Sequence, residues 1–265
     1  MIKSEAIKAP LLNLVSETGE FIRNEKGKIN EQQIDDKSHN SFVTYVDKNA
    51  ENMLVGGLRK LIPESGFIAE EGTAGDSERE WRWIIDPLDG TTNYIHDIYP
   101  VAVSVALQHN KKTVAGVVYE IGHDEMFYAF EGETAMLNGK PIQTSTHKKI
   151  DESLIATGFP YYDYKRLPGY MKVLDYFMQN TRGIRRHGSA ATDLIYVACG
   201  RFDAFFEYSL SPWDVAAGAF ILQKAGGIVQ DFSGKDNYLF GEEIIATNPH
   251  LAEEIQSIIA QRMND

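Results

Sequence analysis

Residues 83–94 have the sequence Trp-Ile-Ile-Asp-Pro-Leu-Asp-Gly-Thr-Thr-Asn-Tyr, in which an apolar run leads directly into two carboxylates. The run Trp83–Ile85 is short and apolar, which predicts a buried strand. Pro87 has no backbone N–H to donate to a strand ladder, so we expect the chain to leave the sheet just after Asp86. The carboxylates of Asp86 and Asp89 are then expected on one tight turn at the end of the strand.

The residues after this turn suit an anion. Gly90 lets the backbone approach a ligand closely, and Thr91 can begin a short helix whose free amides favour a negative charge. Carboxylate oxygens bind hard cations such as magnesium, and these cations also bind phosphate oxygens. Asp-Pro-x-Asp-Gly is equally ordinary turn chemistry, so the stretch alone fits a turn as well as it fits a metal and phosphate site.

Spacing excludes several other motifs. An EF-hand loop has acids at every second position before its glycine, whereas Pro87 and Leu88 separate Asp86 from Asp89. The same two residues rule out the Asp-x-Asp-Gly-Thr motif of the aspartyl-phosphate phosphatases. The Walker pattern does not occur in the sequence, and no two histidines have the His-x-x-x-His spacing of a zinc helix.

Two more acidic segments stand at the ends of predicted elements. Phe67–Ala69 is an apolar run that leads into Glu70 and Glu71, which predicts a second strand that delivers acids to a loop. Asp214 follows Pro212 at the start of a predicted helix, which a Gly-Gly pair ends. A solvated loop or a carboxylate that complements the helix dipole would explain each segment alone. Three such loops in one chain favour a shared site.

Together these segments resemble the signature regions of the inositol monophosphatase family, whose members are magnesium-dependent, lithium-sensitive phosphomonoesterases. The resemblance runs from residues 44–51 to the Gly226-Gly227 pair, with the motifs in the family's order. It implies hydrolysis of a small phosphate monoester, with myo-inositol 1-phosphate as the first choice, by a water that magnesium activates. It also implies two or more Mg²⁺ ions as cofactors.

The resemblance assigns roles to individual residues. Glu70, Asp86 and the carbonyl of Leu88 are implied as ligands of one magnesium. The ligands implied for the second are Asp86, Asp89 and Asp214. Thr91 and Asp47 would orient the attacking water, with Glu70 as an alternative proton acceptor. The implied substrate-binding residues are Asp89, Gly90, Thr91, Gly188, Ser189, Ala190, Glu207 and Asp214.

The resemblance implies a five-layered α-β-α-β-α sandwich of the inositol monophosphatase and fructose-1,6-bisphosphatase type. An α+β half, residues 1–149, would carry most metal ligands, and an α/β half, residues 150–265, would carry Asp214 and the substrate contacts. The residue pattern itself predicts helices at 2–23, 47–61, 168–180, 189–199, 214–225 and 250–263. It predicts strands at 67–69, 83–85, 101–108, 113–120, 125–130, 155–157, 202–206 and 244–246.

Composition limits the partners. A formal net charge of −12 argues against nucleic acid and acidic membranes, because both prefer basic surfaces. Bound cations would reverse the local charge and let an acidic protein bind a phosphate ester. The single cysteine excludes an intrachain disulfide, and no apolar run approaches the ~20 residues of a membrane span. We therefore expect a cytoplasmic protein, and the resemblance adds a homodimer.

Two basic positions are further candidates. Lys37 lies in a polar stretch where the family has a mobile active-site hairpin and a lysine, although a solvated surface charge fits it equally well. Arg185 belongs to the one basic cluster, next to the segment 188–190. It would contact a second phosphate or a nucleotide, or else lie on the surface or in a dimer interface.

Relatives with the same fold leave the substrate open. Such proteins also hydrolyse fructose 1,6-bisphosphate or the 2′-phosphate of NADP(H), and the arginine cluster suits both. The residues Thr92-Asn93-Tyr94 and Glu207 favour an inositol phosphate. A non-catalytic metal-binding scaffold is the rival from another class, and it predicts a broken set of carboxylates, whereas every expected carboxylate is present.

Overall fold

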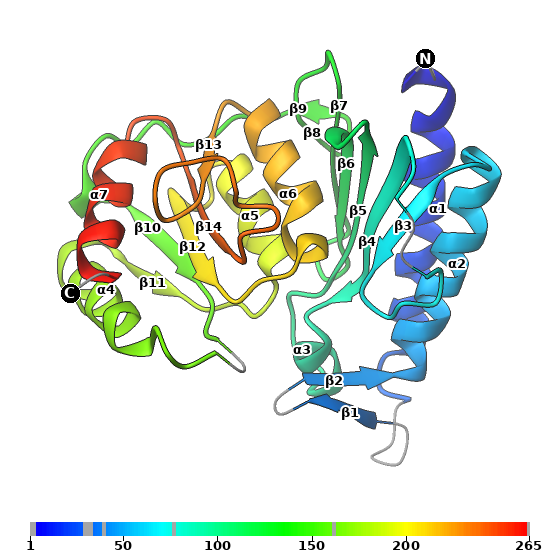
Figure 1. Ribbon diagram of the computed structural model, residues 1–265, viewed down its shortest axis with the longest axis horizontal. Coiled ribbons are helices and arrows are strands. Elements are labelled where there is room, and N and C mark those ends of the chain that lie inside the picture. Colours follow the sequence, from blue (N-terminus) through cyan, green and yellow to red (C-terminus); the bar gives the residue numbers. More distant parts are fainter. Residues whose placement is uncertain (1–3, 29–33, 39–40, 76–77, 161–162, 264–265) are drawn as a thin grey trace.

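The computed structural model describes residues 4–28, 34–38, 41–75, 78–160 and 163–263. These residues form five layers, α-β-α-β-α, built around two main sheets (Figure 1). The five-layered sandwich expected from the sequence is confirmed. No helix in the described ranges has the length and apolar character needed to cross a membrane.

The larger sheet has seven strands in the order β3-β4-β5-β6-β7-β8-β9. β3 and β4 are parallel, and the other neighbours are antiparallel. The bounds of the strands are Gly66–Ala69 (β3), Trp81–Asp89 (β4), Ala102–His109 (β5), Lys112–Glu120 (β6), Glu125–Phe130 (β7), Met136–Leu137 (β8) and Lys140–Pro141 (β9). The strands predicted from residues 67, 101, 113 and 125 are therefore confirmed, whereas the short β8 and β9 were not predicted.

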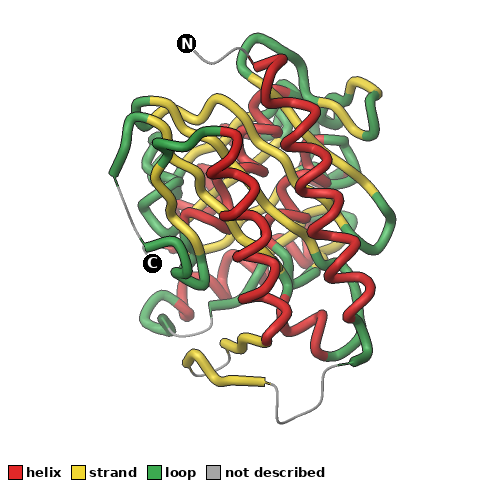
Figure 2. Tube along the Cα trace, turned by 90° about the vertical axis from the view of Figure 1, so that its right-hand side faces the viewer, coloured by secondary structure: helices red, strands yellow, loops and turns green. Residues whose placement is uncertain are grey.

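Two long helices, α1 (Ser4–Glu25) and α2 (Tyr45–Leu61), lie side by side on the outer face of this sheet (Figure 2). Their apolar residues recur at helical spacing and bury one face of each helix, as in Leu11 and Val15 of α1 and Leu54 of α2. A two-stranded sheet of β1 (Ile34–Ser38) and β2 (Ser41–Thr44) connects the two helices.

The smaller sheet has five strands in the order β11-β10-β12-β14-β13. Strands β11, β10 and β12 are parallel to one another, and β14 runs antiparallel to both of its neighbours, β12 and β13. Helices α4 (Leu167–Asn180) and α7 (Ala252–Met263) cover its outer face, and a short 3₁₀ helix η2 (Ile150–Glu152) precedes it. The strands are Leu154–Thr157 (β10), Gly183–Arg185 (β11), Ala204–Tyr208 (β12), Ile228–Gln230 (β13) and Glu243–Thr247 (β14).

The middle layer consists of α5 (Ala190–Ala198) and α6 (Pro212–Lys224), which pack between the two sheets. Every residue of α5 is buried, because a sheet or a helix covers each of its faces. The core around these helices contains Ile84 and Val118 of the larger sheet and Phe205 and Ile244 of the smaller one. The apolar core is thus continuous across the expected boundary at residues 149 and 150, and a division into two domains stays a prediction.

Two local expectations need correction. The chain does not leave the sheet after Asp86, because β4 continues to Asp89 with a register shift between Asp86 and Asp89. Pro87 lies within this irregularity, where no ladder hydrogen bond is required of it. The second helix begins at Tyr45, with Thr44 as N-cap and Asp47 as its capping-box partner three residues later.

Close packing of α6 on β6 depends on Gly116. A Cβ at this position would lie 2.7 Å from the carbonyl oxygen of Ala217 in α6. We expect Gly116→Ala to lower the free energy of unfolding by about 1–3 kcal/mol, because the backbone of the helix cannot give way without shifting the middle layer. Urea denaturation followed by circular dichroism measures this change.

The matched control is Gly56→Ala in α2, where a Cβ would meet nothing within 4 Å. This substitution is expected to raise stability by about 0.5–1 kcal/mol, since alanine restricts the unfolded chain and suits a helix. Equal effects of the two substitutions would contradict the packing argument.

Candidate metal and phosphate site

Four carboxylates from three segments converge where β3, β4 and α6 meet. Glu70 directly follows β3, and its backbone N–H donates to the carbonyl oxygen of Ile85 on β4 at 3.3 Å. Asp86 and Asp89 end β4, and Asp214 lies in the first turn of α6. The side chain of Asp86 shares a hydrogen bond with that of Glu70 and interacts electrostatically with Asp89 and Asp214. The structure therefore brings together the four acids that the sequence singles out.

Burial and like charge act together on these acids. Burial raises the pKa of Asp86 well above its usual value, and the charges of Glu70, Asp89 and Asp214 raise it further. Burial raises the pKa of Asp89 to about 7, although hydrogen bonds from Ser189 and Ala191 lower it. Ionised together, these groups repel one another, and a divalent cation would relieve that repulsion.

Backbone and hydroxyl donors fix the orientation of the carboxylates. Asp86 Oδ1 accepts from the N–H of Leu88 at 2.9 Å. Asp89 Oδ2 accepts from the hydroxyl of Ser189 at 2.6 Å and from the N–H of Ala191 at 2.8 Å, which ties β4 to the start of α5. Asp214 Oδ2 accepts from the N–H of Ser211 at 2.6 Å and so closes the capping box of α6.

Thr91 and Asp47 form a hydroxyl–carboxylate pair at the start of α3 (Thr91–Ile95). Thr91 Oγ1 lies 3.0 Å from Asp47 Oδ1 and 3.1 Å from the carbonyl oxygen of Leu88. The other oxygen of Asp47 accepts from the backbone and hydroxyl of Thr44, at 2.8 and 2.6 Å. Burial raises the pKa of Asp47. Capping of α2 and contact with the site are thus combined in one carboxylate.

Gly90 stands between the acids and Thr91 in a left-handed conformation, with φ of 96°. A Cβ there would lie 3.0 Å from the carbonyl oxygen of Pro100 and 3.4 Å from that of Gly188. Both the backbone angle and the lack of space require glycine, and the turn is consequently held close to the segment 188–190.

A cavity of about 280 Å³ opens beside the acids. Of the residues predicted from the sequence, its walls include Glu70, Asp89, Gly188, Ser189, Ala190, Glu207 and Asp214. Gly158, Arg186, Ser209, Leu210, Ser211 and Trp213 line it as well. Predicted metal and substrate residues from both halves therefore line one cavity, whereas Asp47, Asp86, Leu88, Gly90 and Thr91 are not part of its described lining.

Of the two basic candidates, Arg185 lies on the surface, which is one of the alternatives that the sequence left open. Arg185 lies exposed on β11, where its guanidinium donates to the carbonyl of Ile184 at 2.9 Å, and its neighbour Arg186 lines the cavity instead. The sequence could not choose between adjacent arginines because the short β11 was not predicted. Arg185 ends that strand, and Arg186 directly follows it. Lys37 is in β1, and its side chain is outside the described residues.

Glu207, at the end of β12, is almost completely buried in the wall of this cavity. Burial raises the pKa of its carboxyl well above the usual value, and the nearby acids Asp193 and Asp214 raise it further, whereas Arg186 lowers it. Gly158 leaves room for this carboxyl, because a Cβ at Gly158 would lie 2.0 Å from its atoms.

Sequence reasoning missed the structural roles of two residues that hold the site in shape. Glu51 is buried in α2, and its carboxylate accepts from the backbone N–H groups of Glu71 and Thr73, both at 2.7 Å. The amide nitrogen of Asn93 donates to the carbonyl oxygens of Pro100 and His187, at 2.8 and 2.7 Å. A buried acid on an apolar helix face and an asparagine inside the central motif were the available signals.

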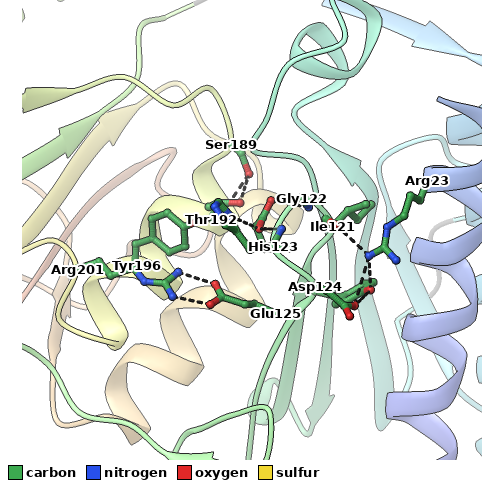
Figure 3. A network of polar contacts seen from close by, with 12 residues as sticks. Arg23, Ile121, Gly122, His123, Asp124, Glu125, Ser189, Thr192, Tyr196 and Arg201 are labelled. Carbon is green, nitrogen blue, oxygen red and sulfur yellow. Dashed lines mark hydrogen bonds and ion pairs between the residues drawn. The ribbon is translucent and has the colours of Figure 1, made fainter. Parts of the chain in front are cut away.

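A second group of possible metal ligands lies at the same end of the larger sheet, farther along its edge, where β6 ends and β7 begins. One ligand atom each of Glu120, His123 and Glu125 lies within 4.8 Å of the others. Figure 3 shows that Arg201 contacts both oxygens of Glu125, at 2.5 and 2.6 Å. Glu120 accepts from the backbone and ring of His123. These contacts explain the group as a polar network that joins β6 and β7 to the loop after α5.

The residues at the first site fit a hard divalent cation. Carboxylates and a backbone carbonyl are all-oxygen donors, which is the set that magnesium and calcium prefer. The raised pKa of Asp86, caused in part by its acidic neighbours, is the electrostatic signature expected of such a set when no cation balances it.

Comparison with known proteins agrees with this geometry. The model of the inositol monophosphatase family matches residues 4–264, and the chain belongs to this family. The putative Nus factor SuhB of Neisseria meningitidis is 41% identical over 243 residues, covering 91% of this chain and 93% of the relative.

Two solved structures have the same fold. The extragenic suppressor protein suhB of Bartonella henselae is 35% identical, with a TM-score of 0.91 and coverage of 96% of this chain and 98% of that one. The IMPase of Thermotoga maritima is 32% identical, with a TM-score of 0.87 and 96% of each chain covered.

The buried carboxyl of Asp193 makes the stability of the folded protein depend on pH. Burial raises the pKa of this carboxyl from 3.8 to about 6, although His187, whose Nδ1 lies 3.1 Å from Asp193 Oδ1, and Arg186 lower it. Between these two pKa values the folded protein keeps a proton on Asp193 that the unfolded chain has released. The free energy of unfolding therefore falls as the pH rises from about 4 to 6.

We expect Asp193→Asn, which cannot ionise, to gain stability relative to the wild type over this range, by up to roughly 3 kcal/mol. Urea unfolding of both proteins at several pH values between 4 and 7 measures the difference. A difference that is independent of pH would contradict this assignment.

Proposed function

We propose that this chain is a magnesium-dependent phosphomonoesterase. The convergence of Glu70, Asp86, Asp89 and Asp214 beside the Thr91–Asp47 pair supports the proposal most strongly. A protein that had kept only the fold as a scaffold would not need acidic neighbours that raise the pKa of the buried Asp86 and Asp89. Membership of the inositol monophosphatase family and the likeness to the Thermotoga maritima IMPase support the same activity.

The proposed ligands of the two cations come from the ends of β3 and β4 and from the first turn of α6. Glu70, Asp86 and the carbonyl of Leu88 would hold one cation, and Asp86, Asp89 and Asp214 a second, with Asp86 shared. Bound magnesium would neutralise the phosphate dianion and make water more acidic. The hydrogen bonds to Asp89 and Asp214 keep these carboxylates oriented before any ligand arrives.

The Thr91–Asp47 pair is proposed to position the attacking water. Thr91 Oγ1 can accept a hydrogen bond from the water while it donates its own proton to Asp47 Oδ1. Thr44 holds the other oxygen of Asp47, so the carboxylate cannot turn away. Gly90 would let the phosphate approach the backbone, and Glu70 is the alternative proton acceptor.

A small polyol phosphate is the proposed substrate, with myo-inositol 1-phosphate as first choice. The cavity walls combine polar and apolar groups, and Glu207 together with the segment 188–190 would contact hydroxyl groups. NADP(H) and fructose 1,6-bisphosphate stay as alternatives, since Arg186 lines the same cavity. A homodimer and a cytoplasmic location stay predictions.

A second role is suggested by a name. The Neisseria meningitidis relative is called a putative Nus factor, and we propose a Nus-factor role for this chain beside phosphate release. The expectation of no nucleic-acid partner, which rested on the net charge of −12, draws no support from that relative.

We expect Asp89→Asn and Asp214→Asn to lower kcat/KM at least a hundredfold, because each removes a charge from the proposed ligand set. Phosphate release measured with malachite green at saturating magnesium tests this. The matched control is Asp175→Asn, which changes an exposed carboxylate on α4 and is expected to leave the rate unchanged. Near-normal rates of both site variants would refute the assignment of ligands.

Removal of the metal with EDTA is expected to abolish phosphate release, and added magnesium to restore it, with lithium as an inhibitor. The same assay, run over inositol 1-phosphate, NADP(H) and fructose 1,6-bisphosphate, ranks the substrates by kcat/KM. A much higher value for either of the last two would replace inositol 1-phosphate as the substrate. Phosphate release that persists in EDTA would refute the metal dependence.

A further inference from the structure

Glu51 is a buried carboxylate on α2 that binds the loop after Glu70. Its side chain is completely shielded from solvent. One oxygen accepts from the backbone N–H of Glu71 and the other from that of Thr73, both at 2.7 Å. Burial of a carboxylate is costly even when donors satisfy it, so its place under an exposed loop calls for a reason.

The loop does not require an acid in order to close. The N–H of Gly72 donates to the carbonyl oxygen of Ala69 at 3.3 Å, which already makes a tight turn. Thr73 is exposed, and the backbone N–H groups of exposed loops can bond to water. What Glu51 adds is therefore a fixed position of the loop relative to α2.

Glu70 is held from two sides as a result. Its own N–H donates to the carbonyl oxygen of Ile85 on β4 at 3.3 Å, and the N–H of the next residue, Glu71, donates to Glu51. The main chain at Glu70 is thus attached to β4 and to α2 at successive residues. This attachment limits the positions that the carboxylate of Glu70 can reach.

The same face of α2 carries Asp47. Residues four apart lie on one face of a helix, and Asp47 and Glu51 are both buried. Asp47 accepts from Thr91 Oγ1 at 3.0 Å, and the charge of Glu70 acts on it electrostatically. One helix therefore holds both the pair proposed to position water and the loop that follows a proposed metal ligand.

We infer that Glu51 is a positioning residue for magnesium, which sets the affinity for the cation that Glu70 would help to hold without contacting that cation itself. This inference rests on the proposed function. Glutamine at position 51 keeps the size of the side chain, but it has one acceptor oxygen, and its NH₂ group would face a backbone N–H. One of the two hydrogen bonds to the loop would be lost.

The test measures magnesium binding directly by calorimetric titration. We expect Glu51→Gln to weaken the Kd for magnesium about 10- to 100-fold, which is the usual effect of removing a group that orients a metal ligand. The magnesium concentration for half-maximal phosphate release should rise by the same factor. At saturating magnesium, kcat should stay within about twofold, because every proposed ligand is still present.

A double variant tests whether Glu51 acts through Glu70. In a Glu70→Gln background, the further change Glu51→Gln should alter the magnesium Kd by less than about twofold, since the ligand that it positions is already changed. Independent, multiplying losses would overturn the inference.

Glu120→Gln is the matched control. Glu120 is equally buried, and its carboxylate accepts from the backbone N–H groups of Gly122 and His123, at 2.8 and 2.7 Å, in the turn between β6 and β7. This variant loses the same kind of hydrogen bond, so it should lower the Tm about as much as Glu51→Gln and leave the magnesium Kd unchanged. Equal losses of magnesium affinity in the two variants would mark a general structural effect and overturn the inference.

An exposed substitution decides the matter if Glu51→Gln does not fold. Gly72 lies between the two N–H donors with φ of 68°, and a Cβ there would meet nothing within 4 Å. Gly72→Ala strains this turn and should weaken magnesium binding about 3- to 10-fold. Gly132→Ala, with φ of 83° and equally open space in the turn after β7, should leave the Kd unchanged. Equal magnesium affinities of these two variants would overturn the inference.

The titration separates a failure of this inference from a failure of the proposed function. Equal Kd values for magnesium in the wild type and in Glu51→Gln would overturn the inference alone. If magnesium binds but no ester releases phosphate, the proposed function fails, and the titration still decides the role of Glu51. A wild type that binds no magnesium would overturn both.

Discussion

The mutual repulsion of four carboxylates, of which Asp86 and Asp89 are buried, is the constraint on which the site depends. Separate segments deliver Glu70, the pair on β4 and Asp214, so the fold must hold like charges together against their tendency to separate. It does so with donors that are themselves parts of secondary structure, namely the turn after Asp86 and the first turns of α5 and α6. Asp89 and Asp214 accept hydrogen bonds at the starts of α5 and α6 and also line the cavity, so stability and site geometry rest on shared atoms.

The middle layer makes this convergence possible. Because α5 and α6 are buried between the two sheets, their first turns point toward the end of β4 from the opposite half of the chain. Close contacts such as Gly116 against Ala217 keep the helix pressed on the larger sheet. Displacement of α6 would move Asp214 away from Asp86, which links core packing directly to the proposed metal ligands.

Much of the fold and of the site could be predicted from the sequence. The apolar periodicity of α4 to α7 and of β5 to β7 appeared at nearly the observed bounds, because these elements bury regular faces. The acids were recognisable because each stands beside a strand or helix end. Pro87 misled the reading of β4, since a bulge accommodates a residue that a regular ladder rejects.

The sequence by itself determined the residue types: oxygen ligands in three segments, a glycine at position 90 and a net negative charge that requires cations to bind a phosphate ester. Only the tertiary structure decided that Arg186 rather than Arg185 lines the cavity and that Asp193 is buried beside His187. The physical reason is that local sequence sets backbone preference and charge. The distances between segments far apart in the chain depend on how the layers pack.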